Sequence, residues 1–136
     1  MNLINRDTDY AIRALCFIAQ HKKERLAVSD LVKALKIPQP FLRKILQKLN
    51  KNGLLISYKG QGGGFSLARI PRKILISHLI KIFQGSLRLN ECFFKKQRCP
   101  ETNDCSLKKR VDIIEKHVIS ELESISIASL MRKGRD

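Results

Sequence analysis

Three cysteines within fourteen residues place the strongest constraint on how this chain can fold. Cys92, Cys99 and Cys105 have the spacing C-x6-C-x5-C within the segment ECFFKKQRCPETNDCS. This segment contains few apolar residues and several turn-forming ones, so it is predicted to be a loop and not a core element. Bonds to a metal ion or a cluster would order such a loop, because they replace the missing hydrophobic burial. We therefore expect a metal or cluster site here.

The charge of the chain is strongly positive. Its 136 residues include 27 Lys and Arg but only 12 Asp and Glu, which gives a net charge of +15. Between Leu31 and Asn90 there is no acidic residue, whereas Lys and Arg occur twelve times. A block with one sign of charge repels itself, and nucleic-acid phosphates are the leading candidates to offset that cost. An anionic membrane surface is the weaker alternative.

No apolar run reaches the length of a transmembrane helix, and the N-terminus lacks the layout of a signal peptide. We therefore expect a soluble, cytoplasmic protein that does not act at a membrane. Cysteines in the cytosol more often bind metal, react or lie buried than form structural disulfides. Cys16, within the first predicted helix, is interpreted as a small buried hydrophobe.

The N-terminal third of the chain predicts short helices. Thr8 is the predicted N-cap of a first helix that ends near Gln20, with Asp9 in its first turn, where a carboxylate suits the helix dipole. Ser29 is the predicted N-cap of a second helix, which ends before Pro38.

A third helix is predicted to begin near Pro40 and to end at Asn52-Gly53, with an apolar stripe and a basic outer face. Two helices joined by a tight connection form a helix-turn-helix, whose second helix enters the DNA major groove. A pair of amphipathic helices with a solvated basic face would show the same pattern. The next segment favours the first interpretation, because strands at 54–59 and 65–69 around the glycine-rich tip 60–64 predict a β-hairpin wing.

The surface of these elements supplies the expected DNA contacts. Glycines at the wing tip let the backbone approach the sugar-phosphate surface closely. The full predicted set is Ser29, Pro38, Gln39, Pro40, Phe41, Arg43, Lys44, Lys48, Lys59, Gln61, Gly62, Gly63 and Arg69.

The C-terminal third predicts a short helix at 77–84, the cysteine loop and a long helix for which Ser106 is a good N-cap. Apolar residues recur along the long helix at three- and four-residue steps, which predicts a seam that pairs with a second copy of the chain. The seam consists of Leu107, Val111, Ile114, Val118, Leu122 and Ile125. Packing back on the head is the alternative for this helix.

Several of these motifs together resemble a known family. TDYAIRAL, the helix-turn-helix, the wing sequence GQGGGFSLAR, the three cysteines and the terminal ESISIASL resemble the Rrf-two family of bacterial transcription regulators. The IscR-, NsrR-, RirA- and CymR-like proteins belong to it. The resemblance spans nearly the whole chain. It implies a dimeric winged-helix repressor or activator that often holds an iron–sulfur cluster.

The resemblance also implies ligands. Cys92, Cys99 and Cys105 match the family's cluster cysteines, and iron–sulfur clusters require thiolates. IscR-like members have a histidine three residues after the last cysteine, where this chain has Lys108. NsrR-like members use an aspartate from the partner subunit, and Asp9 matches its position. This match favours a 4Fe–4S cluster over a 2Fe–2S cluster, although helix-end electrostatics alone would account for Asp9.

The resemblance further implies that the first turn of the recognition helix contacts bases. Gln39 and Arg43 are the candidates to read base edges, whereas Lys44, Lys48 and Lys59 are expected to meet phosphates.

The predicted fold is mainly α with a small β wing, divided as follows. Residues 1–85 form a winged helix-turn-helix domain, 86–106 a cluster-binding loop, 107–131 a dimerisation helix with a C-terminal cap, and 132–136 a tail. The expected function is a dimeric regulator, a repressor, that binds an operator in double-stranded DNA. Its iron–sulfur cluster would sense redox, nitric oxide or iron status.

Two alternatives remain. The cysteines would hold zinc or form a thiol-disulfide switch in a DNA-binding regulator, or the chain would be a small electron carrier. No catalytic motif or small-molecule substrate is predicted, so the chain is not expected to be an enzyme.

Overall fold

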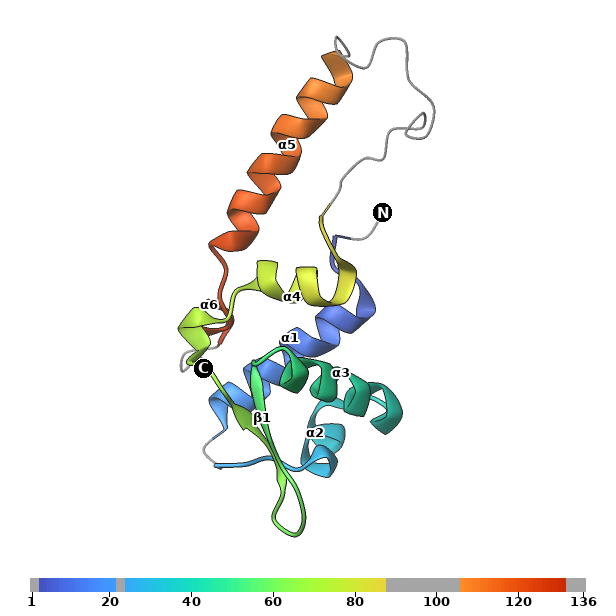
Figure 1. Ribbon diagram of the computed structural model, residues 1–136, viewed down its shortest axis with the longest axis vertical. Helices are drawn as coiled ribbons and strands as arrows, with labels where there is room; N and C mark the ends of the chain where they lie inside the picture. Colours follow the sequence, from blue (N-terminus) through green and yellow to red (C-terminus); the bar gives the residue numbers. More distant parts are fainter. Residues whose placement is uncertain (1–2, 22–23, 88–105, 132–136) are drawn as a thin grey trace.

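Helix α1 (Arg6–Gln20) lies at the centre of the fold (Figure 1). The computed structural model describes residues 3–21, 24–87 and 106–131. Ala11, Ala14 and Leu15 are fully buried on one face of α1, since residues three and four positions apart share a helix face. This face contacts α2, α3, α4 and α6, so a single apolar stripe organises the core.

Helices α2 (Val28–Leu35) and α3 (Gln39–Lys51) form the helix-turn-helix. Lys36 ends α2 in the left-handed conformation, with φ of 57°, and Pro38 is the N-cap of α3. A proline suits a helix start, where its missing N–H costs nothing. Leu31, Leu42 and Leu46 are completely buried between the two helices and α1, and this leaves the opposite face of α3 in solvent.

Strands β1 (Leu55–Tyr58) and β2 (Gly64–Leu67) pair antiparallel and form the wing. Before α2, Leu26 extends this sheet by one bridge to Phe65, with backbone N–H···O distances of 3.0 and 2.8 Å. Both side chains are buried, so the wing is attached to the head by backbone hydrogen bonds and by apolar packing.

The 3-10 turn η1 (Pro71–Lys73) leads into α4 (Ile76–Gln84), which packs on α1. Helix α5 (Ser106–Glu123) projects from the head and contacts α4, and α6 (Ile127–Leu130) returns to pack on α1 and η1 (Figure 1). Ile127 in α6 is fully buried. The chain end after α5 therefore contributes to the core of the head.

The predicted fold class, mainly α with a small β wing, is confirmed. Each predicted helix and strand that falls on described residues is present within three residues of its expected bounds, apart from the end of the long helix. In the described part of the chain, every helix is too short or too polar to cross a lipid bilayer.

Three local predictions were wrong. The N-cap of α1 is Asn5 and not Thr8, because the Asn5 side chain accepts the Thr8 N–H at 2.8 Å. The N-cap of α2 is Ala27 and not Ser29, and the Asp30 carboxylate accepts the Ala27 N–H at 3.2 Å. Helix α5 ends at Glu123, so Ile125 does not continue its seam.

The position of Ile125 has a physical reason. Its carbonyl accepts the Ile76 N–H at 3.0 Å, and Ile127 N–H donates to the Ile74 carbonyl at 2.8 Å. These backbone bonds require an extended chain at this point, and Ser126 then caps α6. A helix continued through Ile125 would lose both bonds to the head.

Candidate nucleic-acid interface and cluster ligands

The first turn of α3 presents an exposed surface to solvent. Leu42, Ile45, Leu46 and Leu49 are buried in the core, and the other positions of α3 are exposed. Arg43 and Lys44 lie on this outer face, and Phe41 is 41% exposed although it is a large apolar residue. Exposed cationic and aromatic side chains at the start of a helix suit contact with base edges and phosphates in a major groove.

The predicted DNA contacts lie at the surface, and only Gly63 among them is half-buried. They fall into separate groups. Those from Pro38 to Lys44 surround the start of α3, Ser29 lies on α2, and Lys59 to Gly63 form the wing tip. Lys48 and Arg69 are in a different place, because both line a pocket at the base of the wing. The structure thus divides a set that the sequence presents as one.

The wing tip depends on glycine at two positions. A Cβ atom on Gly63 would lie 2.3 Å from the Tyr58 carbonyl oxygen. On Gly64, where φ is +145°, it would lie 2.3 Å from the Leu26 carbonyl oxygen. Both contacts are with backbone atoms that cannot move away cheaply, so only glycine fits this turn and its attachment to the head.

Two arginines that the sequence interpretation missed lie beside these elements. The Arg6 guanidinium stacks 4.8 Å from the centre of the Phe41 ring, and Arg25 stacks 3.9 Å from the Tyr58 ring in β1. Such cation–π pairs bring positive charge next to α3 and the wing. No local pattern indicates these pairs, because the partners are more than thirty residues apart in the sequence.

The cationic surface is not neutralised within the described part of the chain. The ion pairs Arg13–Asp9 and Lys108–Asp112 lie in α1 and α5, each between residues one helical turn apart. The acid-free block that contains α3, the wing and α4 contributes no carboxylate. The positive charge of this surface is therefore available to attract an external anion.

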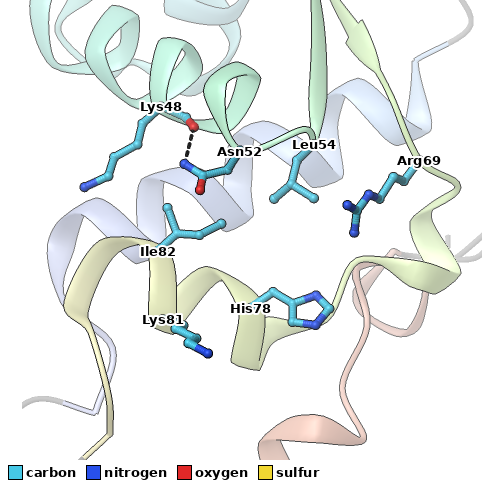
Figure 2. Close-up of a pocket in the computed structure, with 7 residues that line it drawn as sticks. All are labelled: Lys48, Asn52, Leu54, Arg69, His78, Lys81 and Ile82. Atoms are coloured by element: carbon cyan, nitrogen blue, oxygen red, sulfur yellow. Dashed lines mark hydrogen bonds between the residues drawn. The ribbon is translucent and has the colours of Figure 1, made fainter.

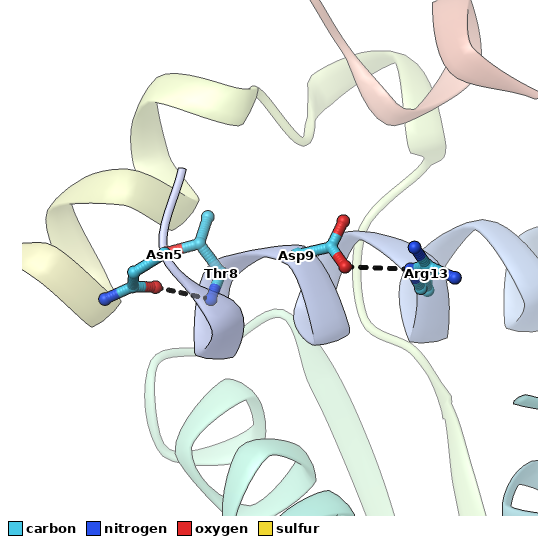
Figure 3. A network of polar contacts seen from close by, with 4 residues as sticks. All are labelled: Asn5, Thr8, Asp9 and Arg13. Atoms are coloured by element: carbon cyan, nitrogen blue, oxygen red, sulfur yellow. Dashed lines mark hydrogen bonds and ion pairs between the residues drawn. The ribbon is translucent and has the colours of Figure 1, made fainter. Parts of the chain in front are cut away.

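The start of α1 exposes the carboxylate that was predicted as a ligand (Figure 3). Asp9 Oδ2 lies 2.9 Å from Arg13 Nε, and the Asp9 side chain is 43% exposed. One residue earlier, Thr8 is completely buried. The buried Thr8 and the Asn5 cap therefore hold the helix start, while the Asp9 carboxylate is accessible to another molecule.

The three clustered cysteines, Cys92, Cys99 and Cys105, lie outside the described residues. The described chain stops at Leu87, shortly after α4, and resumes at Ser106, the first residue of α5. In residues 3–21, 24–87 and 106–131, no three His, Cys, Asp or Glu side chains gather as a metal site.

Two described residues bear on the other ligand candidates. Burial raises the pKa of the half-buried Cys16 thiol, which disfavours the thiolate that metals bind. Lys108 occupies the position at which the sequence resemblance places the histidine of IscR-like proteins. Its side chain carries an ammonium group, which forms an ion pair with Asp112 at 3.0 Å. An ammonium group offers no lone pair to a metal.

Helix α5 carries a partly unpaired apolar surface. Leu122 is buried and Val118 packs against the core near α4. Farther out, Leu107, Ile113 and Ile114 are 69%, 64% and 55% exposed. Ile113 was not in the predicted seam. An apolar surface of this kind on a projecting helix is typical of a protein–protein interface.

Together, the exposed basic face of α3, the wing and the acid-free surface define a winged helix-turn-helix DNA-binding protein. The profile of the Rrf2 family, described as "Iron-dependent Transcriptional regulator", matches residues 4–133. The chain belongs to this family of transcription regulators.

Individual relatives agree with this assignment. The HTH-type transcriptional regulator NsrR of Oceanobacillus iheyensis is 31% identical over 138 aligned residues, which cover 100% of this chain and 93% of the relative. The T. potens IscR structure has a TM-score of 0.73 at 24% identity, covering 95% of this chain and 85% of that one. CymR, the global cysteine regulator of B. subtilis, has a TM-score of 0.76 at 21% identity, covering 96% of both chains. The two structures support the fold.

Proposed function

We propose that this chain acts in the cytoplasm as a dimeric transcription repressor whose operator binding depends on an iron–sulfur cluster. In this proposal the cluster is of the 4Fe–4S form, and its ligands are Cys92, Cys99, Cys105 and the partner subunit's Asp9. When bound, the cluster supplies a redox- and nitric-oxide-reactive group. The observation that carries the proposal is the exposed Asp9 carboxylate in a chain with three clustered thiols.

The surroundings of Asp9 suit a ligand that exchanges. Its pair with Arg13 is exposed, and exposed ion pairs contribute only about 0–1 kcal/mol. Asp9 can therefore leave Arg13 for a metal at little cost. The helix α1 dipole also stabilises a carboxylate in the first turn.

Contacts around α1 connect this position to the DNA-binding surface. Gln84, the last residue of α4, accepts hydrogen bonds from Thr8 and from the backbone of Asn5. Helix α1 also packs directly against α3. A change in what Asp9 binds therefore acts on the helix that supports α3, and a dimer presents two such α3 helices to half-sites one DNA turn apart.

The first experiment is the visible spectrum of protein purified without air, with iron, sulfide and zinc assayed on the same sample. We expect a brown protein with iron and acid-labile sulfide, and an operator affinity that differs between the holo and apo forms. Equal affinities would contradict the proposed regulation, because a ligand without differential affinity shifts no equilibrium. A colourless protein with zinc would replace the cluster by a zinc site at the same cysteines.

The role of Asp9 is tested by Asp9→Ala with two matched controls. Asp7→Ala removes a carboxylate from the same helical turn, and Arg13→Ala breaks the ion pair while it keeps Asp9. We expect only Asp9→Ala to change the cluster absorption and to speed cluster loss. The same spectrum in all three variants would remove Asp9 from the ligand set and leave the three cysteines.

A further inference from the structure

A pocket of about 430 Å³ lies between the end of α3, the base of the wing and α4 (Figure 2). Four basic side chains from these three elements line it: Lys48 from α3, Arg69 from the chain after β2, and His78 and Lys81 from α4. We call it the basic pocket. Its volume is within the range typical of small-ligand sites.

Apolar residues form part of the wall of the basic pocket. Leu54 is 2% exposed, and Ile82 is partly buried against the core. Figure 2 shows both between the α3 and α4 side chains. Low-dielectric walls in a cleft lined by one sign of charge concentrate the field and raise the local concentration of a counter-ion.

The charges of the basic pocket are not balanced within the described part of the chain. Among the described residues, neither Lys48, Arg69, His78 nor Lys81 pairs with a carboxylate, and Lys48 lies 5.4 Å from the Phe83 ring centre. No Asp or Glu occurs anywhere from Leu31 to Asn90. Four exposed basic side chains that line one pocket without a described carboxylate give it a positive potential that attracts an external anion.

Capping of α3 does not explain these cations. Basic side chains often gather at helix C-termini because free carbonyls await donors. Here the Lys48 carbonyl accepts from the backbone and side chain of Asn52, at 3.1 and 2.8 Å. Leu49 and Asn50 carbonyls accept the N–H groups of Leu54 and Gly53, at 2.9 and 3.0 Å. These three carbonyls of the last turn are therefore satisfied without the basic residues.

The position of the basic pocket separates it from the proposed DNA-reading surface. Arg69 lies beyond the end of β2, six residues from Gly63 at the wing tip, which is roughly 20 Å along an extended chain. Helix α4, which supplies two of the basic residues, lies on the opposite side of α1 and α3 from the wing tip (Figure 1). The basic side chains that line the pocket come from α3, the chain after β2 and α4, so an anion in the pocket would lie between these elements.

We propose that the basic pocket binds the phosphate group of a small phosphorylated molecule and that the bound ligand fixes α3 and the wing relative to α4. A backbone phosphate of flanking operator DNA would present the same phosphate group to the pocket. The separation of the pocket from the wing tip favours the free molecule. Asp9 is not among the residues that line this pocket, and phosphate binding there requires no cluster.

Pyrophosphate is the probe for direct binding, followed by calorimetry and by the imidazole proton resonances of the full-length protein without DNA. The chain has three histidines, so His78→Gln assigns the His78 signal by its disappearance. We expect saturable binding that shifts the His78 signal.

Lys81→Gln should weaken binding about tenfold, the typical effect of one charge-assisted hydrogen bond. Lys73→Gln is the matched control, because Lys73 is an exposed residue of η1 outside the pocket. It should change the affinity for pyrophosphate less than about twofold.

The second arm measures operator affinity across salt concentrations for the same variants. If pyrophosphate does not bind but Lys81→Gln reduces the salt slope by about one, the phosphate comes from DNA. If Lys81→Gln behaves like Lys73→Gln in both arms, the proposal is overturned. Both arms apply to colourless and brown protein alike, so failure of the cluster proposal leaves them unaffected.

Discussion

Thr8 Oγ1 donates a 2.7 Å hydrogen bond to Gln84 Oε1 and thereby joins the first turn of α1 to the last residue of α4. Gln84 Oε1 also accepts the Asn5 N–H at 2.8 Å, and Gln84 Nε2 donates to the Leu3 carbonyl at 3.1 Å. Thr8 is completely buried, so its hydroxyl has no access to water. Gln84 thus fixes the helix start that carries Asp9.

Thr8→Val removes the hydroxyl and keeps the shape of the side chain. We expect a loss of about 1–2 kcal/mol in the free energy of unfolding, because a buried hydrogen bond is deleted and one acceptor of Gln84 loses a donor. Urea denaturation measures this change. Thr8→Ser keeps the hydroxyl and should retain the bond while it loses one methyl group. Wild-type stability in Thr8→Val would show that the bond contributes nothing.

The helix starts show where the sequence was insufficient. Asn5 and Thr8 are both good capping residues, and the pattern of apolar residues does not decide between them. The structure decides through a partner 76 residues away, because Gln84 binds the Thr8 hydroxyl and leaves Asn5 to cap. The apolar faces of α1 and α3 were predictable, since burial of one stripe follows from helical periodicity.

The candidate site was predictable to different degrees. The exposed basic face of α3 and the glycine tip follow from local pattern. The stacking of Arg25 on Tyr58 and the presence of His78, Lys81 and Arg69 in one pocket do not, because they depend on how α4 and the loop before α2 pack. Ile125 continued the apolar period, but backbone pairing with the segment before α4 ended the helix first.

Arg43 and Lys59 are expected to contribute to operator binding in different ways. If Arg43 reads a base edge, Arg43→Ala should cost about 1–3 kcal/mol on the operator and relax selectivity at one position. If Lys59 meets a phosphate, Lys59→Ala should weaken specific and non-specific DNA equally and lower the salt slope by about one. Binding titrations on selected and scrambled duplexes measure both. The same loss on both duplexes for Arg43→Ala would make Arg43 a phosphate contact.

Gly64→Ala should damage the attachment of the wing to the head. Its Cβ would lie 2.3 Å from the Leu26 carbonyl oxygen, at a φ of +145° that side chains rarely adopt. We expect a loss of about 2–4 kcal/mol in unfolding free energy from strain and the broken bridge. Gly60→Ala is the comparison, because its Cβ would meet no atom within 4 Å and only its φ of +81° is strained, at about 1–2 kcal/mol. Equal losses, measured by chemical denaturation, would mean that the Leu26 bridge is unimportant.

Ile114 on α5 tests the proposed dimer. Its side chain is 55% exposed in the single chain, so Ile114→Glu leaves the core of the head intact and acts on a second copy of the chain. A carboxylate in an apolar seam is desolvated without a partner, and we expect the dimer dissociation constant to rise at least about 100-fold. Sedimentation equilibrium measures it.

Ser120→Glu is the matched control for Ile114→Glu, since it adds the same charge at an exposed position of α5 outside the predicted seam. It should remain dimeric. Operator affinity should fall with dissociation in Ile114→Glu alone, because a monomer contacts one half-site and loses the second set of phosphate contacts. If Ile114→Glu stays dimeric and binds the operator normally, the exposed residues of α5 do not form the dimer interface.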